Sequence, residues 1–135
     1  MTSSAITLLP RLLLATGWTC TPSETDPKRE VWRRGSEWQL AWTTAACGTD
    51  TAALGARLQD LLWVAETATS STRLQLGERL GLLRAADAAL DEAAAYRAAG
   101  EDRRADASER MARLTIMAAG VDPAAWIATR EVSDG

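Results

Sequence analysis

The stretch WTCTPSETDPKREVWRRGSEWQLAWTT, residues 18–44, decides the fold that this sequence predicts. It holds four of the six tryptophans in a chain of 135 residues, and a fifth follows at Trp63. Indole surface on this scale is costly to leave in water. The tryptophans therefore mark either the core of the domain or a place where a partner binds, and the clustering does not name an activity.

Three short antiparallel β-strands are expected in this stretch, because aromatic and β-branched side chains alternate with turn signals. The strands cover residues 18–21, 30–34 and 37–44. In the third strand Trp38, Leu40 and Trp42 share one parity, which predicts a common buried face. The second strand alternates less clearly, since each of its faces would carry one apolar and one basic residue. Its register therefore stays open.

A short apolar helix is expected before the strands, around residues 8–15. Thr7 is its candidate N-cap, and Pro10 is tolerated only if it lies in the first turn. Pro10 and Arg11 interrupt the apolar run, and no basic segment precedes it, so a signal peptide is not expected.

After Gly48 the apolar period changes from two to between three and four, which predicts helices. The expected helices run from Asp50 to about Ala65, over about 73–99, from 101 to 118, and from Asp122 onward, with a connection at 67–72. Asp50 and Asp122 are candidate caps, and Gly100 is placed to end a helix. The helix at 73–99 carries an apolar stripe that only Asp87 interrupts. That stripe can pack on the preceding helix or on a second copy, which leaves a homodimer open.

These elements predict one α+β domain. Residues 1–47 form a Trp-rich helix and β-meander, residues 48–130 form a helical part of about four helices, and residues 131–135 form a tail that should fray. Trp18, Trp38 and Trp42 are expected in the core. Trp32 and Trp63 are expected to be exposed.

The composition excludes several kinds of chemistry. The chain has no histidine, which removes the commonest general base and metal ligand, and its two cysteines, Cys20 and Cys47, cannot complete a structural zinc site alone. We therefore expect no catalytic residues, no metal and no cofactor. No segment approaches the ~20 apolar residues that span a bilayer, so a cytoplasmic protein without a membrane partner is expected. Its two cysteines are expected to be reduced, with a disulfide between Cys20 and Cys47 as the alternative. Lys28 is the only lysine among 15 basic residues, which suggests a high-GC bacterium or one of its mobile elements or phages.

Two segments resemble known helical motifs. Residues 86–119 resemble a single tetratricopeptide repeat, with small, aromatic and turn residues at the positions of that family: Ala93, Tyr96, Gly100, Ala105 and Ala112. Glu92 and Glu109 depart from the pattern, and an antiparallel helical hairpin explains the same residues. Residues 116–126 resemble the core of a helix-turn-helix, which implies a recognition helix that begins at Asp122 and presents Thr129 and Arg130.

The basic hairpin at residues 28–34 is the third candidate for function. Basic side chains are interleaved there with Trp32 and Trp38, a combination that binds phosphates and stacks bases. The basic residues are Lys28, Arg29, Arg33 and Arg34. The order of elements from 8 to 65 is similar to small RNA-binding α-β-β-β-α modules, although the Lys-rich helix start of those modules is missing at 48–51. In the alternative interpretation, the arginines pair with nearby glutamates and the indoles pack under helices.

The sequence favours a non-enzymatic protein-protein interaction module, an adaptor or inhibitor, because Trp and Arg are enriched where interfaces carry most of their energy. The expected partner-binding residues are Trp32, Arg33, Arg34 and Trp63. The alternative is a nucleic-acid-binding regulator that uses the basic hairpin or the C-terminal helical corner. Net charge of −3 disfavours broad phosphate binding but allows a local basic patch.

Overall fold

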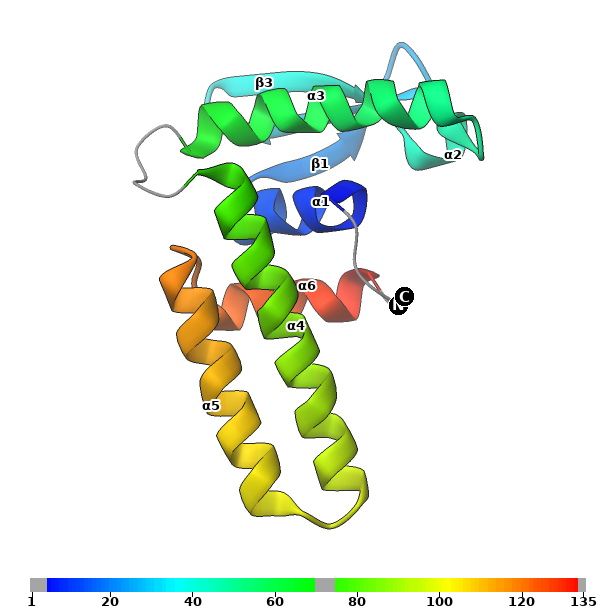
Figure 1. Ribbon diagram of the computed structural model, residues 1–135. Coiled ribbons are helices and arrows are strands. Elements are labelled where there is room, and N and C mark those ends of the chain that lie inside the picture. The colour runs from blue at the N-terminus through cyan, green and yellow to red at the C-terminus, as the bar shows by residue number, and fades with distance from the viewer. Residues whose placement is uncertain (1–4, 70–74, 134–135) are drawn as a thin grey trace.

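The computed structural model describes residues 5–69 and 75–133, and it confirms the α+β class. Three strands and six helices are present in these residues (Figure 1). In chain order they are α1 (Ala5–Ala15), β1 (Thr19–Pro22), β2 (Arg29–Arg34), β3 (Glu37–Trp42), α2 (Thr44–Cys47), α3 (Thr51–Thr69), α4 (Leu76–Ala98), α5 (Asp102–Ala118) and α6 (Pro123–Ser133).

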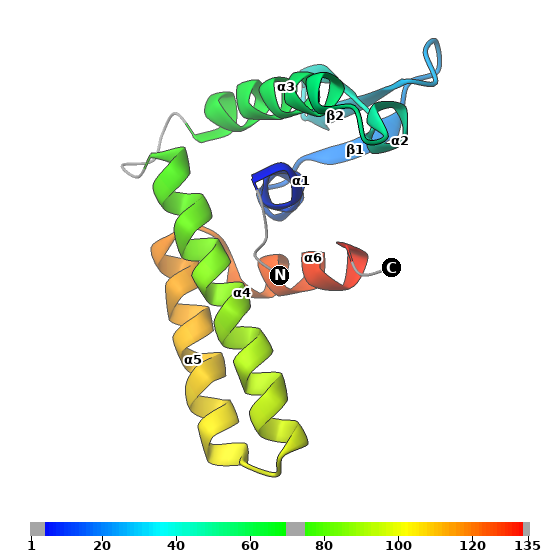
Figure 2. The same cartoon turned by 45° about the vertical axis from the view of Figure 1, so that its right-hand side comes forward.

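The strands form an antiparallel meander in the order β1-β2-β3. Val31 in the central strand lies opposite Thr21 on one side and Leu40 on the other, which fixes the register that the sequence left open. Helices α1 and α3 cover one face of this sheet (Figures 1 and 2).

The predicted orientation of the sheet is wrong, because the helices cover the opposite face. Trp32 is only 2% exposed, whereas Trp38 is 65% exposed and Leu40 is 37% exposed. Residues two apart in a strand share a face, but that pattern does not say which face meets the helices. The small Ala41 lies on the inner face, where it is fully buried and α3 packs on β3.

Helix α1 lies at the centre of the fold, between α3 on one side and α6 on the other (Figure 2). It starts earlier than predicted, so Thr7 is not its N-cap and Pro10 lies inside it rather than in the first turn. Proline costs one backbone hydrogen bond there. Four leucines that are at most 1% exposed offset this cost by packing: Leu8, Leu9, Leu12 and Leu13.

The helical part agrees with the predicted helices, with differences at the ends. Asp50 and Asp122 accept hydrogen bonds from the first turns of α3 and α6, and Gly100 ends α4 with φ of 79°. The segment expected as the end of the third strand instead starts α2, with the Thr43 hydroxyl as its cap. Helix α6 continues to Ser133, so the tail from 131 does not fray where the prediction placed it. Helix α3 continues to Thr69, so the connection expected at 67–72 starts later than predicted. Residues 70–72 of that connection and residues 134–135 lie outside the described residues.

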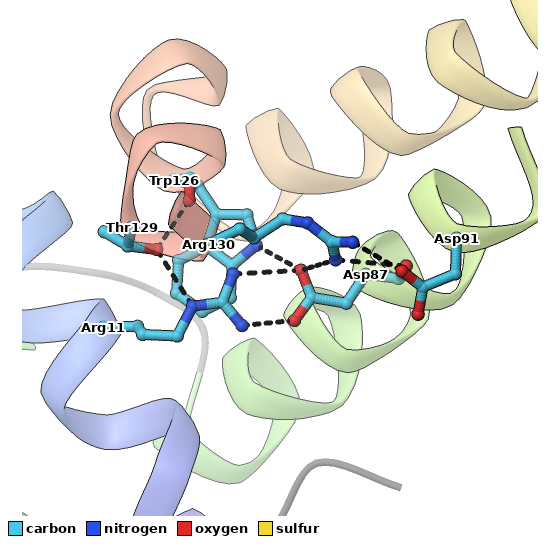
Figure 3. A network of polar contacts seen from close by, with 6 residues as sticks. All are labelled: Arg11, Asp87, Asp91, Trp126, Thr129 and Arg130. Atoms are coloured by element: carbon cyan, nitrogen blue, oxygen red, sulfur yellow. Dashed lines mark hydrogen bonds and ion pairs between the residues drawn. The ribbon is translucent and has the colours of Figure 1, made fainter. Parts of the chain in front are cut away.

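Asp87, the polar residue that interrupts the stripe of α4, is the centre of a buried network (Figure 3). Its carboxylate accepts hydrogen bonds from both terminal nitrogens of Arg11 on α1, at 2.5 and 3.1 Å. The indole N–H of Trp126 on α6 donates to the same carboxylate at 3.0 Å. Arg130, also on α6, lies 3.0 Å from it and reaches Asp91 one turn further along α4. The network therefore joins three helices that are far apart in the sequence.

The remaining donors of this network are also used. Arg11 donates through Nε to the Thr129 hydroxyl at 2.9 Å, and that hydroxyl donates to the backbone carbonyl of Trp126. The Arg11 guanidinium also lies 4.0 Å from the centre of the Trp126 ring. Arg11, Asp87 and Thr129 are each about 6% exposed, so few of these contacts compete with water.

Helices α4 and α5 form an antiparallel hairpin that extends away from the sheet (Figures 1 and 2). Alanines that are at most 1% exposed line the contact between the two helices: Ala86, Ala93, Ala105 and Ala112. At the other end of α5, the buried Arg79 of α4 donates to the carbonyl of Ala119 at 2.9 Å. A cation at the carbonyl end of a helix is favourable, and this contact anchors the base of the hairpin.

We predict that Asp87→Asn lowers the free energy of unfolding by about 3–5 kcal/mol at pH 7, because it leaves the buried Arg11 without its counter-charge. Burial alone would raise the pKa of Asp87, but hydrogen bonds and charge from Arg11, Arg130 and Trp126 outweigh burial and lower it. The stabilisation is therefore complete above the unfolded-state pKa of about 4 and is lost as pH falls further. Urea denaturation from pH 7 to pH 3.5 should show the difference between wild type and variant shrinking below about pH 4.

The matched control is Asp91→Asn, which removes an exposed carboxylate that contacts the same arginine. It should cost less than about 1 kcal/mol at every pH. Equal losses in the two variants, or a loss for Asp87→Asn that does not change with pH, would contradict the role given to Asp87.

Candidate functional site

Two tryptophans from different elements lie exposed beside one hollow in the surface. Trp38 on β3 and Trp63 on α3 are 65% and 64% exposed. Both line a hollow of about 360 Å³ together with Trp18, Ser36, Glu37, Gln39 and Val64. Trp18 is buried, and its indole N–H has no hydrogen-bond acceptor among the described residues. Three indoles therefore form part of the wall of the hollow, and polar side chains form most of the rest.

Trp38 also lines a second hollow, of about 720 Å³, on the outer face of the sheet. Arg33 lies opposite Trp38 in the β2–β3 pairing, so the two side chains share this face. Arg33 is exposed and makes no ion pair with a carboxylate of the described residues. Leu40, on the same face, is 37% exposed. We call Arg33, Trp38, Leu40 and Trp63 the Trp38–Trp63 surface.

The four predicted partner-binding residues separate into two pairs. Arg33 and Trp63 are exposed and belong to the Trp38–Trp63 surface. Trp32 is buried in the core, so the prediction that it is exposed is wrong. Arg34 turns inward, where its guanidinium lies 5.0 Å from the Trp18 ring and donates to the carbonyl of Thr16.

Sequence reasoning missed Trp38 as a surface residue, because it shares the parity of Leu40 and Trp42 and resembled a core face. Trp42 is half-buried beneath Arg29, whose guanidinium lies 4.0 Å from the centre of its ring. Arg29 also lies about 4 Å from Asp26 and Asp60, so it is not the unpaired cation that the basic hairpin suggested. Ala41 was the hint in the sequence, because a small side chain of the opposite parity lets a helix pack on that face and leaves Trp38 on the outer face.

The inner face of the sheet carries a second buried ion pair. Arg57 on α3 donates to Glu30 on β2 at 2.8 Å and to the carbonyl of Trp42 on β3. The other oxygen of Glu30 accepts a hydrogen bond from the Cys20 thiol at 3.0 Å. Glu30 therefore pairs across to α3, and not with the arginines of its own hairpin.

Both thiols are free, and the thiol of Cys20 is not activated. Cys20 and Cys47 form no disulfide. Partial burial, the hydrogen bond to Glu30 and the charge of Glu30 together raise the pKa of Cys20 to about 12, although Arg57 opposes them. A nucleophilic cysteine needs a pKa below its usual value. Cys20 is therefore protonated at neutral pH.

The polar groups of a third hollow are already engaged. This hollow, of about 440 Å³, lies between α1, α3 and α6 and is lined partly by Arg11 and Arg57. Both arginines are paired with buried carboxylates, Asp87 and Glu30. Within the part of the chain that the structure describes, no group of three or more metal-binding side chains occurs. Over residues 5–69 and 75–133, no helix combines the length and the apolar character that crossing a membrane requires.

The two motifs suggested by the sequence serve packing within the chain. In α6, Trp126 and Thr129 are buried and Arg130 binds Asp87 and Asp91, so the side chains of the supposed recognition helix contact the protein itself. The stripe of α4 is likewise used inside the chain, since Leu80 and Leu83 belong to the core. The segment similar to a tetratricopeptide repeat forms the single α4–α5 hairpin.

No protein-family model, curated protein or solved structure matches this chain. A function is therefore inferred from the geometry of the Trp38–Trp63 surface alone.

We predict opposite effects for two tryptophans that are six residues apart. Trp32→Ala should lower the free energy of unfolding by about 3–5 kcal/mol, because it leaves a cavity in the core. Trp38→Ala should change it by less than about 1 kcal/mol, because the side chain is exposed. Chemical denaturation followed by circular dichroism measures both. A larger loss for Trp38→Ala than for Trp32→Ala would show that the sheet faces have been assigned the wrong way round.

Proposed function

We propose that this chain is a non-enzymatic protein-binding module, an adaptor or inhibitor, which binds its partner protein at the Trp38–Trp63 surface. The observation that carries the proposal is that two indoles, each about two-thirds exposed, line the same hollow. Exposed tryptophan side chains leave apolar surface in water in the free protein. Tryptophan is also enriched among the interface residues that contribute most of the binding free energy. Arg33 adds a cation at the edge of this aromatic surface.

A partner protein fits this surface better than a nucleic acid does. Two of the arginines expected to bind phosphate make contacts within the chain instead. Arg34 faces Trp18, and Arg29 lies beside two carboxylates. Lys28 and Arg33 stay exposed, in a chain whose net charge is −3. Nucleic-acid binding generally requires a larger basic area. The hollow beside Trp38 and Trp63 instead combines indole surface with the polar side chains of Ser36, Glu37 and Gln39, a mixture that suits side chains of a protein.

The two free cysteines support a reducing, cytoplasmic location. The raised pKa of Cys20 and the commitment of Arg11 and Arg57 to buried carboxylates support a role without catalysis. The predominance of arginine supports an origin in a high-GC bacterium or one of its mobile elements.

Affinity capture from an extract of the source organism, followed by mass spectrometry, tests the proposal. Wild type should retain at least one protein that the double variant Trp38→Ala, Trp63→Ala loses by at least tenfold, because interface tryptophans are commonly worth about 2 kcal/mol or more. Circular dichroism and melting should match wild type, since both side chains are exposed.

The control is Met111→Ala with Met117→Ala, which removes two equally exposed apolar side chains from α5. It should retain the protein that the tryptophan variant loses. The proposal is contradicted if both variants capture the same proteins as wild type, or if the captured material is nucleic acid whose binding weakens steeply with salt.

A further inference from the structure

Helix α5 carries a second exposed apolar surface, on the projecting hairpin and away from the elements that form the Trp38–Trp63 surface. Met111, Leu114 and Met117 are 61%, 55% and 60% exposed. They are spaced three residues apart, so they follow one side of the helix. Buried residues such as Ala105, Ala112 and Ile116 occupy the opposite side, against α4. The exposed stripe therefore plays no part in folding the hairpin.

Arginines extend and flank this stripe. Arg103 and Arg110 continue its line toward the start of α5, eleven and four residues before Leu114, and Arg113 lies beside it. All three are exposed, and none lies within ion-pair distance of a carboxylate of the described residues. We call these three arginines and the three apolar residues the α5 face.

Two of the three carboxylates of α5 are engaged across the hairpin, and the third, Asp102, lies at the first residue of the helix. Arg97 on α4 binds Asp106 at 2.8 Å and Glu109 at 3.0 Å, across the hairpin. These contacts raise the pKa of Arg97 through the hydrogen bonds to Asp106 and Glu109. The α5 face is therefore locally positive, although the chain as a whole has a net charge of −3.

We propose that the α5 face binds an amphipathic helix of another protein, with acidic residues beside its apolar stripe. Methionine and leucine along one helix side accept a partner helix at spacings of three and four, and the unpaired arginines supply its charge complement. A second copy of this chain fits less well. In an antiparallel pair centred on Leu114, Arg110 and Arg113 face Ala118 and Thr115 and meet no carboxylate, and in a parallel pair like charges face each other.

The proposal goes beyond the Trp38–Trp63 surface and makes the chain an adaptor with two independent surfaces. One surface lies on the sheet and α3, and the other lies on the projecting hairpin. Such a chain would hold two proteins together without catalysing a reaction.

Two synthetic probes test this inference by fluorescence anisotropy. Both are amphipathic helical peptides of about 18 residues with the same leucine stripe, flanked by glutamates in one peptide and by lysines in the other. Wild type should bind the glutamate peptide about tenfold more tightly, as expected for a few exposed charge pairs. The overall negative charge favours the lysine peptide, so this preference can arise only from a local basic face.

Charge reversal gives the decisive comparison. The triple variant Arg103→Glu, Arg110→Glu, Arg113→Glu should prefer the lysine peptide, and Met111→Gln, Leu114→Gln, Met117→Gln should lose both peptides while melting like wild type. Trp38→Ala with Trp63→Ala should bind the glutamate peptide unchanged, which separates this result from the proposed function.

Three results would overturn the inference. The first is a wild-type preference for the lysine peptide, or no measurable binding of either peptide. The second is a wild-type dimer in sedimentation that the glutamine variant converts to monomer, because a second copy would then cover the α5 face. The third is tighter binding to vesicles of anionic phospholipid than to the glutamate peptide, because the face would then serve a membrane surface.

Discussion

The buried carboxylate of Asp87 is the constraint on which the arrangement of the helices depends. It lies among apolar residues on α4, where an unpaired charge would be strongly destabilising, and so it must be met by donors from elsewhere. Arg11 supplies them from α1, and Trp126 and Arg130 supply them from α6 (Figure 3). Because Arg11 donates two parallel hydrogen bonds to the carboxylate, its geometry also restricts the angle between α1 and α4. The hairpin, the central helix and the last helix are thereby held in one arrangement.

A second buried ion pair fixes the sheet to the helices. Glu30 and Arg57 join β2 to α3, and the same arginine binds the carbonyl of Trp42 on β3. This pair can form only if the face that carries Glu30 points toward α3. Trp32 shares that face and is buried with it, whereas Trp38 is left on the outer face. Trp38 is thus exposed because the Glu30–Arg57 ion pair turns the other face of the sheet toward α3.

The fold class and most element positions could be predicted, because they follow from local patterns. The change of apolar period after Gly48, the caps at Asp50 and Asp122 and the stop at Gly100 all act over a few residues. The orientation of the sheet could not be predicted in this way. Alternation shows that Trp38 and Leu40 share a face, but whether that face is buried depends on an ion pair between residues 27 positions apart. The candidate site shows the same limit. Arg33 and Trp63 are exposed as predicted, whereas Trp32, predicted to be exposed, is buried, and Trp38, predicted to be buried, is exposed.

The polar residues that disrupted apolar patterns were informative, although their pairing was not visible in the sequence. Asp87 interrupts the stripe of α4 and Arg11 interrupts the first helix, and each explains the presence of the other. Arg130, in the segment that resembled a recognition helix, completes the same network. Which misplaced charges meet is a property of the tertiary fold, since 76 residues separate Arg11 from Asp87.

Hydroxyl-radical footprinting of the tryptophans, read by mass spectrometry, tests the central claim most directly, namely that the tryptophans divide into a structural set and a binding pair. In the free protein, Trp38 and Trp63 should be oxidised rapidly, while Trp32 and Trp126 should be protected. In the complex recovered from an extract of the source organism, Trp38 and Trp63 should become protected as well. Rapid oxidation of Trp32 in the free protein, or equal oxidation of Trp38 and Trp63 with and without the bound protein, would contradict the account.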